Sequence, residues 1–129
     1  MRALLIVITV VAIGLFGPIT SDADETGDQS NLAWFAIEII TGPNWDPNLS
    51  PYEQAFFKEH SVHLQQLRAD GHIVMGARYS DIGLLVFHSE SIDAINKLMV
   101  ADPSMQAGTF TYEIHAMNVF YPGFVGTSK

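Results

Sequence analysis

The chain of 129 residues contains no cysteine and few basic residues. Without cysteine it can form no disulfide, no thiol nucleophile and no cysteine-based zinc site. Only 6 Lys and Arg stand against 14 Asp and Glu, which gives a formal net charge of −8. Because nucleic acid and anionic membrane surfaces bind basic patches, this balance argues against both as partners.

Three common enzyme motifs are also missing. The sequence has no glycine-rich phosphate loop, no nucleophile elbow and no His-Glu-x-x-His metal helix. We therefore expect no cofactor, and any catalysis must rely on the ionisable side chains of the chain itself.

The N-terminus has the three-part pattern of a secretory signal. Arg2 precedes an apolar run over residues 3–16, and Ser21 and Ala23 are small residues where a signal peptidase would read them. The run is shorter than the roughly 20 apolar residues of a membrane span. We expect a signal peptide over 1–23 and an exported protein, periplasmic or secreted. The alternative is an uncleaved N-terminal membrane anchor.

The remainder divides into three segments. Residues 24–31 are polar and acidic and are expected to form a flexible leader. Residues 32–122 carry the hydrophobic patterning of one domain, and residues 123–129 form a tail without a pattern.

Hydrophobic periodicity and turn signals predict six elements within the domain. The expected strands cover 32–41, 72–79, 82–88 and 109–120, and the expected helices run from Ser50 to about Asp70 and from Ser89 or Ser91 to about Val100. The order β-α-β-β-α-β predicts an α+β, ferredoxin-like fold, in which an antiparallel four-stranded sheet carries two helices on one face.

The other face of that sheet needs a cover of its own. The first strand is apolar on both sides, and so is the last, with Phe110, Tyr112 and Ile114 on one side and Met117 and Val119 on the other. An exposed apolar face is typical of an interaction surface. We therefore predict a homodimer in which two sheets face each other.

His60 and Asp102 are the candidate catalytic residues. At 100° per residue, one face of the first helix carries Phe56, His60, His63, Leu64 and Leu67. An imidazole on an apolar face needs a hydrogen-bond partner, and Asp102 could orient it as a general acid–base. Alternatively, the ring is a core histidine bonded to a backbone carbonyl, and Asp102 before Pro103 only ends the second helix.

Trp45, Arg78 and His63 are candidate substrate-binding residues. Trp45, in a Gly/Pro-rich loop, could close over a ligand, or fold back over the core edge. Arg78 could bind an anionic ligand, or pair with Asp81 on the surface. His63 shares the face of His60, although a bond to a backbone carbonyl is the simpler role. His60 and His63 alone are too few for a metal site, because zinc takes three or four ligands, so no metal is expected.

The chain from about Phe35 to Phe120 resembles the YCII-related (YciI-like) family of the dimeric α/β-barrel superfamily. The matching residues are Gly42-Pro43, Trp45-Asp46, Gln54, His60, Gly71, Gly76, Asp81, Gly83, Asp102-Pro103 and Gly108. The resemblance implies a ferredoxin-like subunit that dimerises through its sheet, with an active site at His60 and Asp102. One departure is Gly76-Ala77-Arg78, where the family often has Gly-Gly-Pro.

Two functions fit these observations. In the first, the protein is a small-molecule lyase or isomerase that uses a His60–Asp102 acid–base dyad, because neither reaction needs a nucleophile or a redox cofactor. Some members of the family are associated with the breakdown of chlorinated aromatic compounds. In the second, the protein is a non-catalytic exported ligand-binding or structural module of the same fold.

Overall fold

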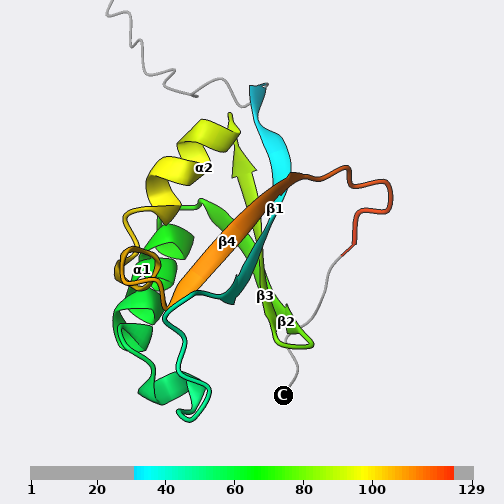
Figure 1. Ribbon diagram of the computed structural model, residues 1–129. Coiled ribbons are helices and arrows are strands. Elements are labelled where there is room, and N and C mark those ends of the chain that lie inside the picture. The colour runs from blue at the N-terminus through cyan, green and yellow to red at the C-terminus, as the bar shows by residue number, and fades with distance from the viewer. Residues whose placement is uncertain (1–30, 124–129) are drawn as a thin grey trace, which may run out of the picture.

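The computed structural model describes residues 31–123 (Figure 1). The predicted signal peptide, residues 24–30 of the predicted leader and residues 124–129 of the predicted tail lie outside that range. Its strands are β1 (Ala33–Thr41), β2 (Ile73–Tyr79), β3 (Ile82–Ser89) and β4 (Phe110–Ala116). Its helices are the 3-10 turn η2 (Pro51–Glu53), α1 (Phe57–Ala69), α2 (Ile92–Met99) and α3 (Pro103–Gln106). Within residues 31–123, no helix has both the length and the apolar content needed to cross a membrane.

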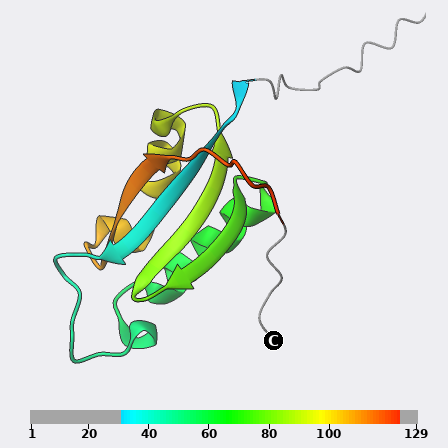
Figure 2. The same cartoon turned by 90° about the vertical axis from the view of Figure 1, so that its right-hand side faces the viewer.

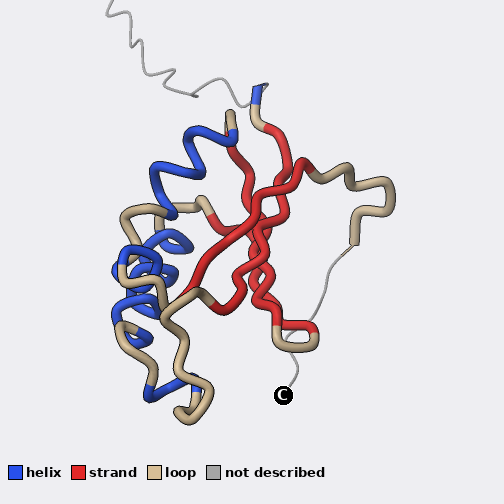
Figure 3. The backbone as a smooth tube through the Cα atoms, in the orientation of Figure 1, coloured by secondary structure: helices blue, strands red, loops and turns tan. Residues whose placement is uncertain are grey.

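The four strands form one antiparallel sheet in the order β2-β3-β1-β4. The helices α1, α2 and α3 all lie on one side of the sheet, as the blue and red segments of Figure 3 show. Figure 2 shows the opposite face of the sheet, which no helix covers. This arrangement confirms the predicted α+β fold with an antiparallel four-stranded sheet. It is compatible with a ferredoxin-like topology.

The core lies between the sheet and the helices. Alternate residues of β1, Phe35, Ile37 and Ile39, are buried toward the helices, as period-2 alternation requires. Phe87 on β3 and Ile95 and Met99 on α2 complete the fully buried centre. The predicted strands and the second helix are therefore confirmed to within a few residues, apart from the end of β4.

The first helix begins later than predicted. Glu53 does accept bonds from the backbone N–H and hydroxyl of Ser50, but the turn that follows is only the short 3-10 segment η2. The chain then leaves the helical region at Gln54 and turns left-handed at Phe56 (φ 62°). This break exposes Phe56, which was expected to face the sheet, and turns Phe57 inward instead.

The segment after α2 also differs from the prediction. Asp102-Pro103 does not merely end a helix, because Asp102 caps a further short helix, α3. At the other end, β4 stops at Ala116, so Met117 and Val119 lie beyond the strand.

The uncovered side of β4 therefore carries Thr111, Glu113 and His115, and not the apolar residues that supported the dimer prediction. The apolar character of that face comes from β1 and β3, through Trp34, Ile40, Leu84 and Val86.

A close backbone contact joins the loop after β1 to the turn before β4. The Gly42 N–H donates to Thr109 O (2.9 Å) and the Asn44 N–H to Gly108 O (2.9 Å). A Cβ on Gly42 would lie 2.2 Å from that same Gly108 oxygen, and Gly108 itself has φ +71°. Both positions therefore require glycine. The contact brings the Trp45 loop beside α3 and the start of β4.

Candidate active site

His60 and Asp102 meet in the interior between α1 and α3. His60 is 7% exposed and Asp102 is fully buried. The distance from His60 Nδ1 to Asp102 Oδ2 is 2.6 Å, which is short for a hydrogen bond between nitrogen and oxygen. The structure thus brings together the two residues that were proposed as a catalytic pair.

The Asp102 carboxylate is itself held in place by α3. As the N-cap residue it accepts the backbone N–H of Ser104 at Oδ1 (2.9 Å), and the Ser104 hydroxyl donates to the same oxygen (2.7 Å). Pro103 fits the first helical position, where no N–H is needed. Capping the short helix and orienting His60 are therefore two roles of one side chain.

Ser104 was not recognised from the sequence. It is fully buried, and its Oγ lies 3.2 Å from His60 Nδ1 as well as bonding to Asp102. Its position two residues after Asp102 could have indicated its role, because an aspartate that caps a helix usually accepts the backbone N–H of the second or third helical residue.

Hydrogen bonding decides the protonation state of the carboxylate. Burial pushes the pKa of Asp102 upward, but the bonds from His60 and from the Ser104 hydroxyl outweigh it, and the pKa is lowered overall. Asp102 is therefore ionised at neutral pH. An ionised acceptor at Nδ1 favours the His60 tautomer that carries its proton on Nδ1.

The other nitrogen of the ring is left free for chemistry. Among residues 31–123, every hydrogen bond of the His60 ring is made at Nδ1. Since no buried side-chain nitrogen or oxygen between residues 31 and 123 lacks a partner, Nε2 must be open to solvent. His60 also lines a cavity, and with the proton on Nδ1 the accessible Nε2 is the basic atom of its ring.

That cavity measures about 490 Å³ and lies between α1 and the helix-facing side of the sheet. Its walls are mostly apolar and aromatic, and include Ile39, Trp45, Phe57, Leu64, Leu85 and Phe110. Gly76 and Gly83 also line it, where larger side chains would fill part of the space. Volume and lining both suit a small organic ligand.

Trp45 forms a fixed wall of the cavity. Its ring packs against Phe110 (centroids 5.5 Å apart) and belongs to the edge of the core. Its loop is tied down by the buried Gln54, whose side chain bonds to the backbone N–H and C=O of Asp46 and to Leu49 O. Trp45 thus covers the core edge and faces the cavity at once, and these bonds argue against a lid motion.

Arg78 and His63 have different positions. Arg78 lines the cavity, and no hydrogen bond or ion pair of its side chain is found in the described part of the chain, so the alternative pairing with Asp81 is absent. His63 is not among the residues that line this cavity; its Nε2 lies 2.9 Å from Leu98 O, the backbone contact that was the alternative.

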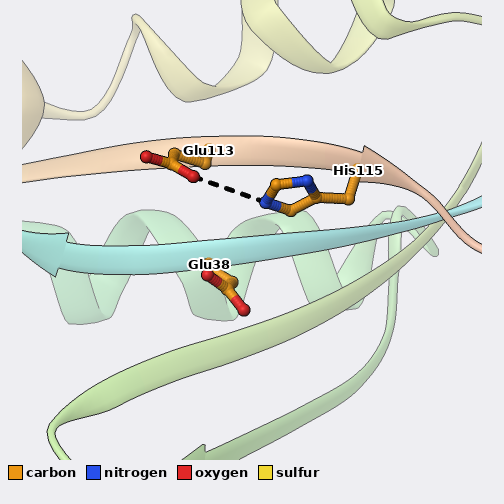
Figure 4. Close-up of side chains that lie close together, drawn as sticks. All are labelled: Glu38, Glu113 and His115. Carbon is orange, nitrogen blue, oxygen red and sulfur yellow. Dashed lines mark ion pairs between the residues drawn. The ribbon is translucent and has the colours of Figure 1, made fainter.

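A second cluster of ionisable groups lies on the uncovered face of the sheet. Glu38 on β1 faces Glu113 on β4, with His115 beside them (Figure 4). Their three ligand atoms lie within 4.8 Å of one another, so the set could contact a cation. Each group has a protein partner, however: His115 Nε2 is 3.5 Å from Glu113, and the Tyr79 hydroxyl donates to Glu38. Glu113 lies on the face of the sheet opposite the helix layer that holds His60.

No protein-family model and no curated protein matches the chain.

Proposed function

We propose that the protein is a small-molecule lyase or isomerase that needs no cofactor, with His60 as general acid–base and Asp102 as its positioning partner. The observation that carries this proposal is the 2.6 Å bond from buried His60 to buried Asp102, beside a cavity of about 490 Å³. Burying the Asp102 carboxylate without a partner would cost free energy, and His60 supplies that partner. The cavity can hold a substrate beside the free nitrogen of the ring.

The chemistry that fits is proton transfer at carbon. His60 Nε2 would accept a proton from a C–H bond of the substrate, and the electron pair of that bond would form a new double bond. In an elimination, a leaving group departs from the neighbouring carbon with its electrons. In an isomerisation, an existing double bond next to that carbon breaks as the new one forms, and its electron pair accepts the proton from the imidazolium at the far carbon. Asp102 stabilises the imidazolium in both cases without accepting its proton.

We also propose that the chain is an exported member of the YCII-related family and forms a dimeric α/β barrel. Three observations support this proposal: the strand order, the His60–Asp102 bond and the close contact of Gly42 with Gly108. These four residues are among those that carry the resemblance. The apolar residues Trp34, Ile40 and Leu84 on the uncovered sheet face would pack against a second copy.

The catalytic proposal can be tested before the substrate is known. An imidazolium that equilibrates with solvent before it returns the proton leaves deuterium on the substrate carbon. A panel of small unsaturated carboxylic acids and lactones can therefore be incubated in D2O with the protein. NMR would then follow the loss of the carbon-bound proton signal. We expect exchange with the wild type, and a loss of about 100-fold or more in His60→Ala.

The matched control is His63→Ala, which removes a neighbouring imidazole that does not line the cavity. Exchange that persists in a folded His60→Ala protein would rule out the dyad. Binding without exchange for every panel member would favour the alternative, a non-catalytic ligand-binding module. The departure at Gly76-Ala77-Arg78 is the feature that favours that alternative.

A further inference from the structure

Arg78 is a cation without a protein partner on the wall of a largely apolar cavity. It lies on β2, on the side of the sheet that faces the helices, with Gly76 two residues earlier. Among the described residues, no carboxylate is within ion-pair distance of it and no hydrogen bond of its side chain is found. It is the only Lys or Arg among the residues that line this cavity.

The other charged groups of the cavity are accounted for. His60 is bonded to Asp102, and the Asp81 carboxylate accepts the Ser80 hydroxyl (3.0 Å). Asp81 also lines the cavity but forms no ion pair with Arg78. Arg78 is exposed and bonds to no other side chain in residues 31–123, so its guanidinium donors are accessible to a ligand.

We propose that the cavity binds a small planar monocarboxylate, with its carboxylate on Arg78 and its unsaturated or aromatic body against Trp45, Phe57 and Phe110. A single guanidinium matches one carboxylate through two parallel hydrogen bonds. A phosphate dianion would need more positive charge than one arginine supplies in a protein of net charge −8. The three aromatic rings offer faces and edges to a flat ligand.

The binding of a carboxylate by Arg78 does not depend on the proposed function. Only the orientation of the ligand toward His60 rests on it. Arg78 lies on β2 and His60 on α1, so they bound the cavity from the sheet and from the helix layer. An anchored carboxylate would leave the carbon skeleton to extend along the apolar walls toward Nε2 of His60. Arg78 is thus a specificity-determining residue, and His60 performs the proton transfer.

Calorimetric titration with cinnamate and with its neutral counterpart cinnamamide tests the assignment. We expect the wild type to bind cinnamate at least tenfold more tightly than cinnamamide. Arg78→Gln should weaken cinnamate binding about 10- to 100-fold, as expected for losing hydrogen bonds to a charged group, and leave cinnamamide unchanged. Arg78→Lys should recover part of the loss. The control Arg68→Gln changes an exposed arginine of α1 outside the cavity and should bind as the wild type does.

Several results would overturn the assignment. These are equal binding of acid and amide, an unchanged Arg78→Gln, no cinnamate binding at millimolar concentration, or tighter binding of benzylamine that is lost in Asp81→Asn. The proposed function fails separately: if no carboxylate exchanges protons but cinnamate binding depends on Arg78, the site is a carboxylate-binding module and the inference about Arg78 stands.

Discussion

Replacing Asp102 with asparagine should destabilise the protein in a pH-dependent way. The carboxylate accepts three bonds in a fully buried position, one from His60 and two from Ser104. Asparagine has one side-chain oxygen and one amide NH2 group. Either the NH2 group replaces the oxygen that faces the imidazole, or it replaces the oxygen that accepts from Ser104 and only a neutral oxygen faces the imidazole. Losing a charge-assisted bond in the interior costs about 1.5–3 kcal/mol, so we expect the free energy of unfolding to fall by that amount at pH 7.

The sign of the pH dependence follows from the lowered pKa of Asp102, which comes from the bonds of His60 and Ser104 prevailing over burial. A carboxyl whose pKa is lower in the folded state stabilises the protein above its unfolded value of about 3.9. That contribution disappears as the pH falls through the folded value. The difference between wild type and Asp102→Asn should therefore be largest near neutral pH and shrink in acid.

Urea unfolding followed by tryptophan fluorescence, at about pH 7, 5 and 3, measures this difference. Asp70→Asn is the control, because that carboxylate is exposed and its partner is the neighbouring Gln66 side chain. If Asp102→Asn is as stable as the wild type at pH 7, or if the difference stays constant down to pH 3, the carboxylate is not held as an ionised partner of His60.

Substitutions at three further positions test the surroundings of the site. Ser104→Ala should cost about 1 kcal/mol of unfolding free energy by removing one bond to Asp102, and unchanged stability would show that this bond contributes nothing. Gly42→Ala should lower the melting temperature strongly, because its Cβ would lie 2.2 Å from Gly108 O; overpacking costs about 1–3 kcal/mol, and a normal melting curve would disprove the close contact. Gly76→Leu should fill the cavity and abolish cinnamate binding while the circular dichroism spectrum is unchanged. Gly76→Ala should retain binding, because its Cβ meets only Leu85 at 3.6 Å; equal binding by both variants would show that the ligand lies elsewhere.

Much of the fold could be predicted because it depends on local patterns. The alternation in β1, the hairpin of β2 and β3 and the serine cap of α2 are all encoded within a few residues. The late start of α1 could not be predicted, because it depends on side-chain contacts that no helical or strand periodicity encodes. Thr109 Oγ1 donates to Ala55 O (2.9 Å), and the Gln54 side chain is engaged with the loop at Asp46 and Leu49.

The contact between His60 and Asp102 could be anticipated for a related reason. A histidine on an apolar face needs a partner, so His60 stood out, but the sequence left open whether a carboxylate or a carbonyl supplied it. His60 has the carboxylate and His63 the carbonyl, a difference of one helical turn that only the packing of α1 decides. The cluster of Glu38, Glu113 and His115 depends on the register of β1 against β4, which no local pattern encodes.

The state of the His60 ring is the most direct test of the central claim, that Asp102 holds this imidazole with Nε2 free toward the cavity. NMR of protein labelled with ¹⁵N-histidine, recorded for the wild type and Asp102→Asn, distinguishes the two ring nitrogens. We expect the neutral form of the wild-type ring to carry its proton on Nδ1, and we expect a changed tautomer or a mixture in Asp102→Asn. A neutral wild-type ring with its proton on Nε2, unaltered by the substitution, would contradict it.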